Sequence, residues 1–170
     1  MAVTVRQENG DDHPAVRAVN RAAFASPAEA DLVDELRQTA RPLISLVAER
    51  NGSVVGHILF SPATFAEQAE MMIMALAPMA VRPQDQDKGI GSLLVRAGLE
   101  ECKRPGADAV IVLGHPEFYP RFGFMPASRF GLGSEFDVPD EVFMAMELVP
   151  GALAGVSGQA RYHRAFRSLG

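Results

Sequence analysis

The sequence of 170 residues contains no tryptophan, one cysteine and no apolar segment of transmembrane length. The single Cys102 excludes an internal disulfide bond and a cysteine-based metal cluster, so we expect no bound metal. The longest apolar run, residues 71–81, contains Pro78 and is too short to cross a bilayer. The first residues lack the basic start and the apolar core of a signal peptide. These absences predict a cytoplasmic protein that has no membrane partner.

Positive charge is also scarce. Lys and Arg number 16 against 21 Asp and Glu, which gives a formal net charge of −5. Nucleic-acid-binding proteins hold phosphates with clustered Lys and Arg, so this balance argues against a nucleic-acid partner. It is compatible with a cationic substrate. The chain length and an apolar fraction of 48% predict one domain with a full core.

Residues 71–105 carry the most informative pattern of the chain. The apolar run at 71–81 predicts a buried strand, and a polar loop at 82–88 leads to Gly89 and Gly91 at the start of a helix. The unpaired N–H groups and the dipole of a helix N-terminus attract an anion, and glycine lets the backbone approach a phosphate closely. The stretch therefore predicts a phosphate site where the helix begins.

The helix that follows this loop is predicted to be amphipathic and to end at Pro105. Cys102 near its end is expected to be a packed small side chain, since no basic neighbour is evident that would lower its pKa. The residues expected on its buried face are Ile90, Leu93, Leu94, Ala97 and Gly98. The residues expected to face water are Arg96, Glu100, Lys103 and Arg104.

The remaining patterns give an element order of β-α-α-β-β-β-α-β-α-β-β, which indicates an α+β (mixed α/β) fold. A strand–helix–strand unit at residues 71–113 should have parallel strands joined by a right-handed crossover. Residues 1–150 are predicted to form one domain, and residues 151–170 an extension that adds an edge strand to it. Pairing of that edge between two chains would form a homodimer. Strands are predicted at residues 3–6, 43–50, 53–60, 70–81, 109–113 and 142–149, helices near 11–23, 26–36, 90–104 and 117–122, and loops at 61–68 and 124–139.

Three motifs resemble the GNAT N-acetyltransferase superfamily. Gln86-Asp87-Lys88-Gly89-Ile90-Gly91 is similar to the Gln/Arg-x-x-Gly-x-Gly/Ala pattern of that family. Residues 76–83 resemble its core strand, and residues 118–124 resemble its Phe-Tyr-x-x-x-Gly-Phe segment. The segment 114–124 further resembles a bacterial branch of predicted N-acetyltransferases with undefined substrates. The resemblance covers residues 3–149.

The resemblance implies a GNAT fold: a central, mostly antiparallel twisted sheet with helices on both faces and one parallel strand pair splayed to hold acetyl-CoA. A β-bulge at Ala77-Pro78 would re-aim backbone groups beside the site. The N–H of Met79 would stabilise the charge that develops on the thioester oxygen. Arg82 would add charge near the phosphates. The implied acetyl-CoA-binding residues are Met79, Ala80, Val81, Gln86, Asp87, Lys88, Gly89, Ile90, Gly91, Ser92, His115 and Tyr119.

The implied general acid is Tyr119, because a tyrosine hydroxyl with a pKa of about 10 stays protonated at neutral pH. The base is open, since residues 71–81 hold no acid where some family members carry a carboxylate. His57, in the strand beside the core strand, is one candidate, and a histidine packed in the core is the other interpretation. Glu29 and Asp31 are further candidates, although Ser26 and Glu29 have the spacing of a capping box. A water relay is a further route.

The implied function is acetyl transfer from acetyl-CoA to a primary amine, of a small molecule or of a protein, by direct attack. A GNAT-fold acyl-CoA-binding or regulatory module without transfer activity is the alternative, motivated by the missing acid. A dinucleotide site at the glycine loop is disfavoured because the third glycine is missing. The acceptor pocket is expected to involve residues 24–31, 61–68 and 130–139, with Phe130, Phe136 and Phe143 as its walls.

Overall fold

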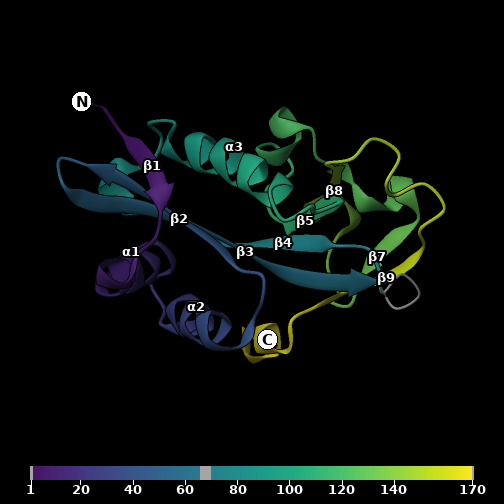
Figure 1. The fold of residues 1–170 in the computed structure, drawn as a ribbon, viewed down its shortest axis with the longest axis horizontal. Coiled ribbons are helices and arrows are strands. Elements are labelled where there is room, and N and C mark those ends of the chain that lie inside the picture. Colours follow the sequence, from purple (N-terminus) through teal and green to yellow (C-terminus); the bar gives the residue numbers. More distant parts are fainter. Residues whose placement is uncertain (1, 66–69, 170) are drawn as a thin grey trace.

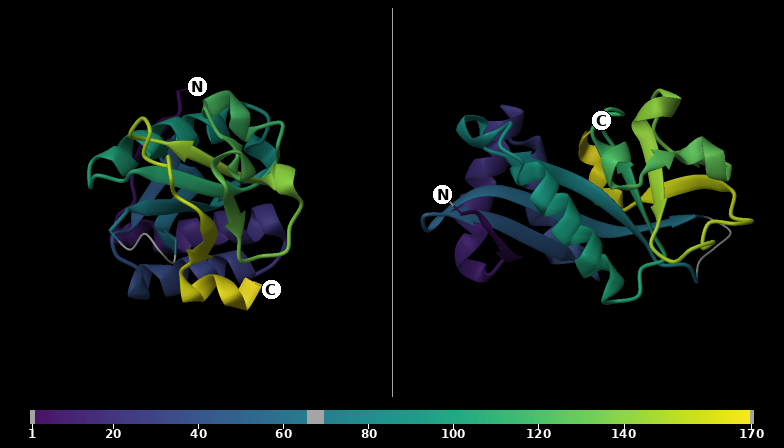
Figure 2. Two further views of the ribbon diagram at one scale, coloured as in Figure 1. Left: turned by 90° about the vertical axis from the view of Figure 1, so that its right-hand side faces the viewer. Right: turned by 90° about the horizontal axis from the view of Figure 1, so that it is seen from above.

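A single mixed sheet runs the length of the molecule, with helices on both of its faces (Figure 1). The computed structural model describes residues 2–65 and 70–169. Helix α3 covers one face, and α1, α2 and the C-terminal segment cover the other, as two further views show (Figure 2). The helices are α1 His13–Phe24, α2 Ala28–Thr39 and α3 Ile90–Lys103. The strands are β1 Thr4–Gln7, β2 Ile44–Arg50, β3 Ser53–Phe65, β4 Ile73–Val81, β5 Ala109–Leu113, β6 Met125–Pro126, β7 Leu132–Ser134, β8 Phe143–Glu147 and β9 Gly158–Tyr162.

The order of the strands is β1-β2-β3-β4-β5-β8-β6, and β9 joins β3 to β7. Neighbours are antiparallel except β4 with β5 and the short pair of β7 with β9. The predicted fold class is therefore confirmed, and the β7–β9 pair adds a second parallel contact at one end of the sheet. A strand forms near residue 145 as predicted, and its side chains alternate: Phe143 and Ala145 face α1 and α2, while Met144 and Met146 face α3.

Strands β4 and β5 separate at their C-terminal ends. Their parallel pairing runs from Ile73 opposite Ala109 to Leu76 opposite Val112 and then stops. Beyond that point β4 stays paired with β3, after a register shift that skips Ala77 and Pro78. The predicted bulge is therefore present. Among the described residues no strand pairs with the edge of β4 from residue 77 to residue 81 on the β5 side, and this separation creates the cavity described below.

Helix α3 packs closely on β3 because glycines stand at the contact. A Cβ added to Gly98 would lie 2.3 Å from Cε1 of Phe60, and one added to Gly56 would lie 3.1 Å from Cδ1 of Leu94. The predicted buried face is only partly correct, because Leu93 is 44% exposed. The contacts with β3 turn the helix so that Val95, Leu99 and Cys102 are buried with Ile90, Leu94 and Gly98.

The C-terminal extension adds a strand, β9, to the same sheet. A strand forms there as predicted, but β9 is not an edge strand, because β3 lies on one side of it and β7 on the other. The reason is that β3 continues to Phe65, past the loop predicted to begin at residue 61, and offers its last residues to β9. Residues 66–69 of that predicted loop lie outside the described residues. After β9, the 3-10 helix η6, Arg164–Leu169, packs against α2.

Other predicted loops and helices differ in detail. The predicted helix at residues 117–122 is a 3-10 helix, η3 Tyr119–Phe122, and residues 124–139 contain the short strands β6 and β7. In the described part of the chain no helix is both long enough and apolar enough to span a membrane.

Candidate active site

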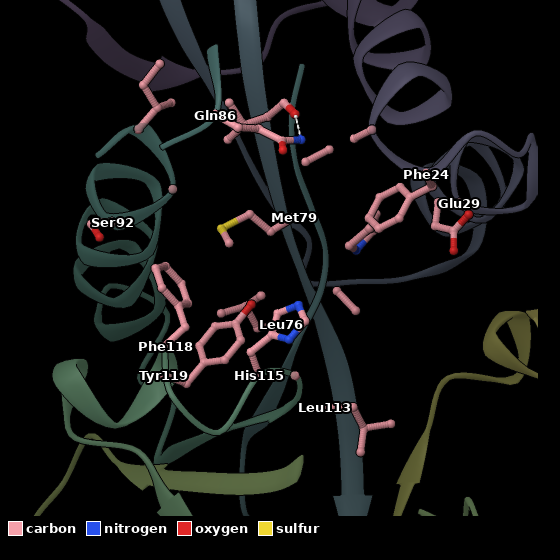
Figure 3. Close-up of a pocket in the computed structure, with 18 of the residues that line it drawn as sticks. Phe24, Glu29, Leu76, Met79, Gln86, Ser92, Leu113, His115, Phe118 and Tyr119 are labelled. Atoms are coloured by element: carbon pink, nitrogen blue, oxygen red, sulfur yellow. Dashed lines mark hydrogen bonds between the residues drawn. The ribbon is translucent and has the colours of Figure 1, made fainter. Parts of the chain in front are cut away.

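A cavity of about 1350 Å³ opens where β4 and β5 separate (Figure 3). One side of it is formed by residues between 76 and 121, and the other by α1, α2, the 136–138 segment and the C-terminal part of the chain. The first group consists of Leu76, Ala77, Pro78, Met79, Ala80, Val81, Asp85, Gln86, Asp87, Gly89, Ile90, Gly91, Ser92, Leu113, Gly114, His115, Glu117, Phe118, Tyr119 and Arg121. The second consists of Ala23, Phe24, Glu29, Leu32, Phe136, Asp137, Val138, Tyr162 and Phe166.

The start of α3 faces this cavity through backbone groups. Gly89 has φ of +83°, a conformation that glycine adopts without strain, and it immediately precedes the helix. Gly91 lies in the first turn, where a Cβ would be 3.5 Å from Cε of Met79 and 3.6 Å from Cζ of Phe118. The first N–H groups of a helix have no partner within it, so they present a partial positive charge to the cavity.

The loop before α3 is fixed by ionic and hydrogen bonds. The buried carboxylate of Asp85 pairs with Arg50 and Arg82. The hydrogen bond from Arg82 is the main cause that lowers the pKa of Asp85 below its usual value. Nε2 of Gln86 donates to the carbonyl of Val81 at 2.9 Å, which ties the loop to the end of β4 (Figure 3). These contacts hold the loop beside the free edge of β4.

Lys88 is the one predicted acetyl-CoA-binding residue that does not border the cavity. Its Nζ donates to the carbonyl of Gln84 at 3.1 Å and lies 3.9 Å from Oδ1 of Asp85. Arg82 directs its Nε to the same carboxylate. Lys88 and Arg82 would therefore have to move away from Asp85 to make the predicted contacts with phosphate. The backbone amides of residues 86–91 could bind phosphate without such a movement.

Tyr119 is held with its ring on the backbone of Gly114. A Cβ at Gly114 would lie 2.2 Å from Cε2 of the tyrosine, so a larger residue there would displace the ring. The ring also meets Phe118 and Phe124 edge-on, with centroids 5.0 and 5.7 Å apart. Burial raises the pKa of Tyr119 to about 12, so the hydroxyl keeps its proton at neutral pH. Within residues 2–65 and 70–169 this hydroxyl has no hydrogen-bond partner, and it lies near His115 and Met79 (Figure 3).

His57 does not border the cavity. It is fully buried between the sheet and α1, with Nδ1 3.2 Å from Nδ2 of Asn20 and Nε2 2.9 Å from Oγ of Ser45. Because Nδ2 of Asn20 can only donate, Nδ1 accepts and Nε2–H donates to Ser45. Burial, with a smaller effect of Arg37, lowers the pKa of His57 to about 3. Both ring nitrogens are occupied, so the geometry does not support the predicted role of His57 as a base.

The two carboxylates considered as alternative bases have different surroundings. Asp31 faces outward and pairs with Arg17 at 2.8 Å. Glu29 borders the cavity from the first turn of α2. The structure therefore brings only Glu29 to the same cavity as Tyr119 (Figure 3).

Only some of the residues predicted to form the acceptor pocket border the cavity. Phe24, Glu29 and Phe136 border the cavity as expected, but Phe130 and Phe143 pack in the core and do not. The described part of segment 61–68 belongs to β3 and does not reach the cavity either. Sequence reasoning missed two wall residues, Tyr162 and Phe166. The spacing of Ala160 and Tyr162 indicates that they lie on one face of a strand, but it does not indicate that this strand pairs with β3.

A splayed parallel strand pair with a glycine-preceded helix beside it leaves a strand edge open next to a helix N-terminus, which is a place suited to an anionic group of a ligand. Residues 11–124 match the family model described as acetyltransferase (GNAT) family. The match covers more than half of the chain, so the protein belongs to the GNAT family of acetyltransferases. The family and fold predicted from the motifs are confirmed.

Two similar proteins are named as uncharacterized N-acetyltransferases. The uncharacterized N-acetyltransferase YjhQ of Escherichia coli strain K12 is 43% identical over 130 residues, which cover 74% of this chain and 72% of YjhQ. The uncharacterized N-acetyltransferase YhbS of the same strain is 34% identical over 163 residues, covering 95% of this chain and 97% of YhbS. The predicted resemblance to bacterial N-acetyltransferases of undefined substrate agrees with both names.

Two solved structures are similar over nearly the whole chain. The crystal structure of Escherichia coli YhbS in complex with CoA has a TM-score of 0.92 at 33% identity, covering 99% of this chain and 93% of that one. A GNAT family acetyltransferase from Brucella melitensis in complex with acetyl-CoA has a TM-score of 0.80 at 33% identity, covering 97% and 98% of the two chains.

Proposed function

We propose that this protein transfers the acetyl group of acetyl-CoA to a primary amine by direct attack of the amine nitrogen on the thioester. The observation that carries the proposal is the unpaired edge of β4 at residues 77–81, which shares one cavity with the start of α3 and the hydroxyl of Tyr119. The relatives named N-acetyltransferases and the solved neighbours with CoA or acetyl-CoA support the same activity.

The residues around the cavity suit the parts of acetyl-CoA. The pantetheine arm would pair with the backbone of Met79, Ala80 and Val81 as an added strand, because that edge has no partner strand on the β5 side. The pyrophosphate would lie on the amides of residues 86–91 and on Ser92, where the dipole of α3 favours an anion. His115, after β5, would contact the arm near the thioester.

Two groups of the chain would assist the reaction. The N–H of Met79 would stabilise the negative charge that develops on the thioester oxygen, which is the role of an oxyanion donor. The hydroxyl of Tyr119 would give its proton to the departing thiolate, since its raised pKa of about 12 keeps it protonated at neutral pH. The alternative of a binding module without transfer rested on the missing acid in β4, and the Tyr119 hydroxyl at the cavity does not favour it.

The proposal is tested by binding and by turnover. Acetyl-CoA at a hundredfold excess over its dissociation constant should stabilise the protein by about 2.7 kcal/mol, measured as a rise in Tm. Release of free thiol across a panel of primary amines should then reveal transfer. Absence of stabilisation would exclude both the transferase and the binding module, and stabilisation without thiol release for any amine would leave only the module.

A pair of glycine variants separates the phosphate site from backbone strain. Gly89→Val should abolish stabilisation by acetyl-CoA, because its side chain would occupy the approach to the amides. Gly52→Val is the matched control, since Gly52 in the β2–β3 turn has φ of +79° against +83° at Gly89, and neither has another group within 4 Å of an added Cβ. Both variants should lose similar unfolding free energy, and only Gly52→Val should keep acetyl-CoA binding. Retained binding in Gly89→Val would contradict the placement of the phosphates.

A further inference from the structure

The acceptor side of the cavity is aromatic. Rings of Phe136 and Tyr162 meet with centroids 5.3 Å apart, and rings of Tyr162 and Phe166 with centroids 5.1 Å apart. On the α1 side, Phe24 borders the same cavity and is 38% exposed, one of few large apolar side chains with so much exposed surface in the described chain. An exposed ring beside a concave site is typical of binding an apolar ligand.

Glu29 supplies a carboxylate oxygen without a partner at this side. Its Oε1 is buried and accepts no hydrogen bond from the described residues. The capping box predicted for Ser26 and Glu29 is not formed, because Pro27 takes the N-cap position and Oγ of Ser26 accepts from the N–H of Ala28 at 3.2 Å instead of from Glu29. Buried polar atoms are normally paired, so an unpaired carboxylate oxygen at a cavity is suited to a donor carried by a ligand.

The charge of the cavity favours a cation on the acceptor side. Glu29 and Asp137 border it there, and neither has an ion pair with another described residue. Among the described lining residues the cationic side chain of Arg121 stands on the other side, after β5, with its guanidinium over the ring of Phe118. An ammonium group has three N–H donors and would be attracted to Glu29.

We propose that the acceptor is a small primary amine carried by a flat apolar group, and that Glu29 binds its ammonium group and accepts one proton from it. The proposal rests on the acetyltransferase function proposed above and names the substrate class of that same site. The flat group packs among Phe24, Phe136 and Phe166, while the nitrogen approaches the splayed end of β4. Figure 3 shows Glu29 and Phe24 on α2 and α1, with Met79 on β4 between them and Tyr119.

The protons balance in this scheme. Glu29 takes one proton from the ammonium and releases it to water. The neutral nitrogen forms the new C–N bond, the C–S bond breaks, and the thiolate takes the proton of Tyr119. The nitrogen loses a second proton to solution, and the tyrosinate takes one back. The products are an amide and CoA thiol, with one proton released in total.

The test uses the full chain with three amines as probes. 2-Phenylethylamine has the ring and the ammonium, ethylamine lacks the ring, and phenylalanine adds a carboxylate that Glu29 and Asp137 would repel. We expect kcat/KM for 2-phenylethylamine to exceed that for either other amine by about tenfold or more. In the presence of saturating CoA, 2-phenylethylamine should also raise Tm more than ethylamine does.

Glu29→Gln keeps the size of the side chain and removes its charge. It should lower kcat/KM for 2-phenylethylamine by about 10- to 100-fold, as expected for loss of a charge-assisted hydrogen bond. Glu35→Gln is the control, because Glu35 lies on the same helix, is exposed and does not border the cavity. It should keep the wild-type value, and both variants should be stabilised by acetyl-CoA as the wild type is.

The outcomes separate the two proposals. If acetyl-CoA fails to stabilise the wild-type protein, the transferase proposal itself is wrong. If acetyl-CoA binds but 2-phenylethylamine has no advantage over ethylamine or phenylalanine in binding or turnover, only the acceptor proposal is overturned. Wild-type kcat/KM in Glu29→Gln would likewise overturn the acceptor proposal alone.

Discussion

Tyr119 and His57 are two polar side chains from which proton transfer is expected on sequence grounds, and the structure gives them opposite surroundings. The Tyr119 residue is 6% exposed, at a cavity, and its hydroxyl has no partner among the described residues. His57 is 0% exposed, and both of its ring nitrogens are bonded, to Asn20 and Ser45. Burial alone therefore does not mark a catalytic group. The two residues differ in that Tyr119 borders the cavity, whereas both ring nitrogens of His57 are already bonded within the core.

The electrostatic effect of burial is the same in kind for both residues but differs in consequence. Burial favours the neutral form, so it raises the pKa of Tyr119 to about 12 and lowers the pKa of His57 to about 3. Neutral tyrosine is a proton donor, which is what the departing thiolate needs. Neutral histidine could accept a proton, but its accepting nitrogen already takes a hydrogen bond from Asn20.

The largest effect should come from removing the hydroxyl of Tyr119. Tyr119→Phe is expected to lower kcat by about 100- to 10,000-fold, the usual contribution of a positioned general acid. Stabilisation by acetyl-CoA should persist because the ring remains. Glu35→Gln is the control, since Glu35 is exposed on α2 and does not border the cavity. Equal thiol-release rates for Tyr119→Phe and wild type would remove Tyr119 as the acid.

A second effect tests the position of the same hydroxyl. Gly114→Ala would push the Tyr119 ring aside, because the new Cβ would lie 2.2 Å from Cε2, and we expect kcat to fall by about 100-fold. Gly98→Ala produces a similar clash, 2.3 Å from Cε1 of Phe60, but in the core between α3 and β3. It should reduce the unfolding free energy by about 1–3 kcal/mol and leave kcat unchanged. If Gly114→Ala and Gly98→Ala lower kcat equally, or lower the unfolding free energy equally without an effect on kcat, then Gly114 does not position a catalytic group as proposed. Thiol-release and urea-unfolding assays measure the two quantities.

His57→Leu should show the opposite profile to Tyr119→Phe. It leaves polar groups of Asn20 and Ser45 without their partner, so the unfolding free energy should fall by about 1–3 kcal/mol. Turnover at a temperature where the variant is folded should stay near the wild-type value. Ser45→Ala removes one of the two contacts and should have a smaller effect in the same urea titration. A large loss of kcat in His57→Leu with acetyl-CoA binding intact would restore the histidine as a catalytic candidate.

The last effect is on the pH dependence of stability. The pKa of His57 falls from 6.5 to about 3 on folding, so between these values the unfolded state binds the extra proton. The contribution of neutral His57 to the unfolding free energy is complete above pH 6.5. It is lost at about 1.4 kcal/mol per pH unit as the pH falls below that value toward the folded-state pKa. Wild type should therefore lose more unfolding free energy than His57→Leu on acidification from about pH 7 to about pH 5. Equal losses would show that His57 is not buried in its neutral form.

The donor side of the site was predictable because its information is local. The apolar run and the glycine loop follow one another in the chain, so the pattern of one short stretch predicts a strand and a helix start. The bulge at Ala77-Pro78 and the splayed strands were implied by the resemblance of motifs in this stretch to the GNAT family. The packed state of Cys102 was also predictable, and burial raises the pKa of its thiol to about 12.

The acceptor side could not be predicted in the same way. Tyr162 reaches the cavity because β9 pairs with the end of β3, which lies about a hundred positions earlier in the chain, and no local pattern indicates this pairing. Whether the side chains of Glu29 and His57 find hydrogen-bond partners depends on contacts between elements that are distant in sequence. Leu93 illustrates the same limit on a helix, since its exposure follows from how α3 is turned against Phe60 and Gly56.

The distribution of the cavity walls along the chain has a practical consequence for engineering. Every lining residue of the group proposed to bind acetyl-CoA lies within residues 76–121, and every other lining residue lies outside that range, in the N-terminal helices or in the last third of the chain. Selectivity for the acceptor could therefore be redesigned by grafting the flanking segments from a relative. The central cassette would stay intact, and the resulting chimaeras would share one donor chemistry.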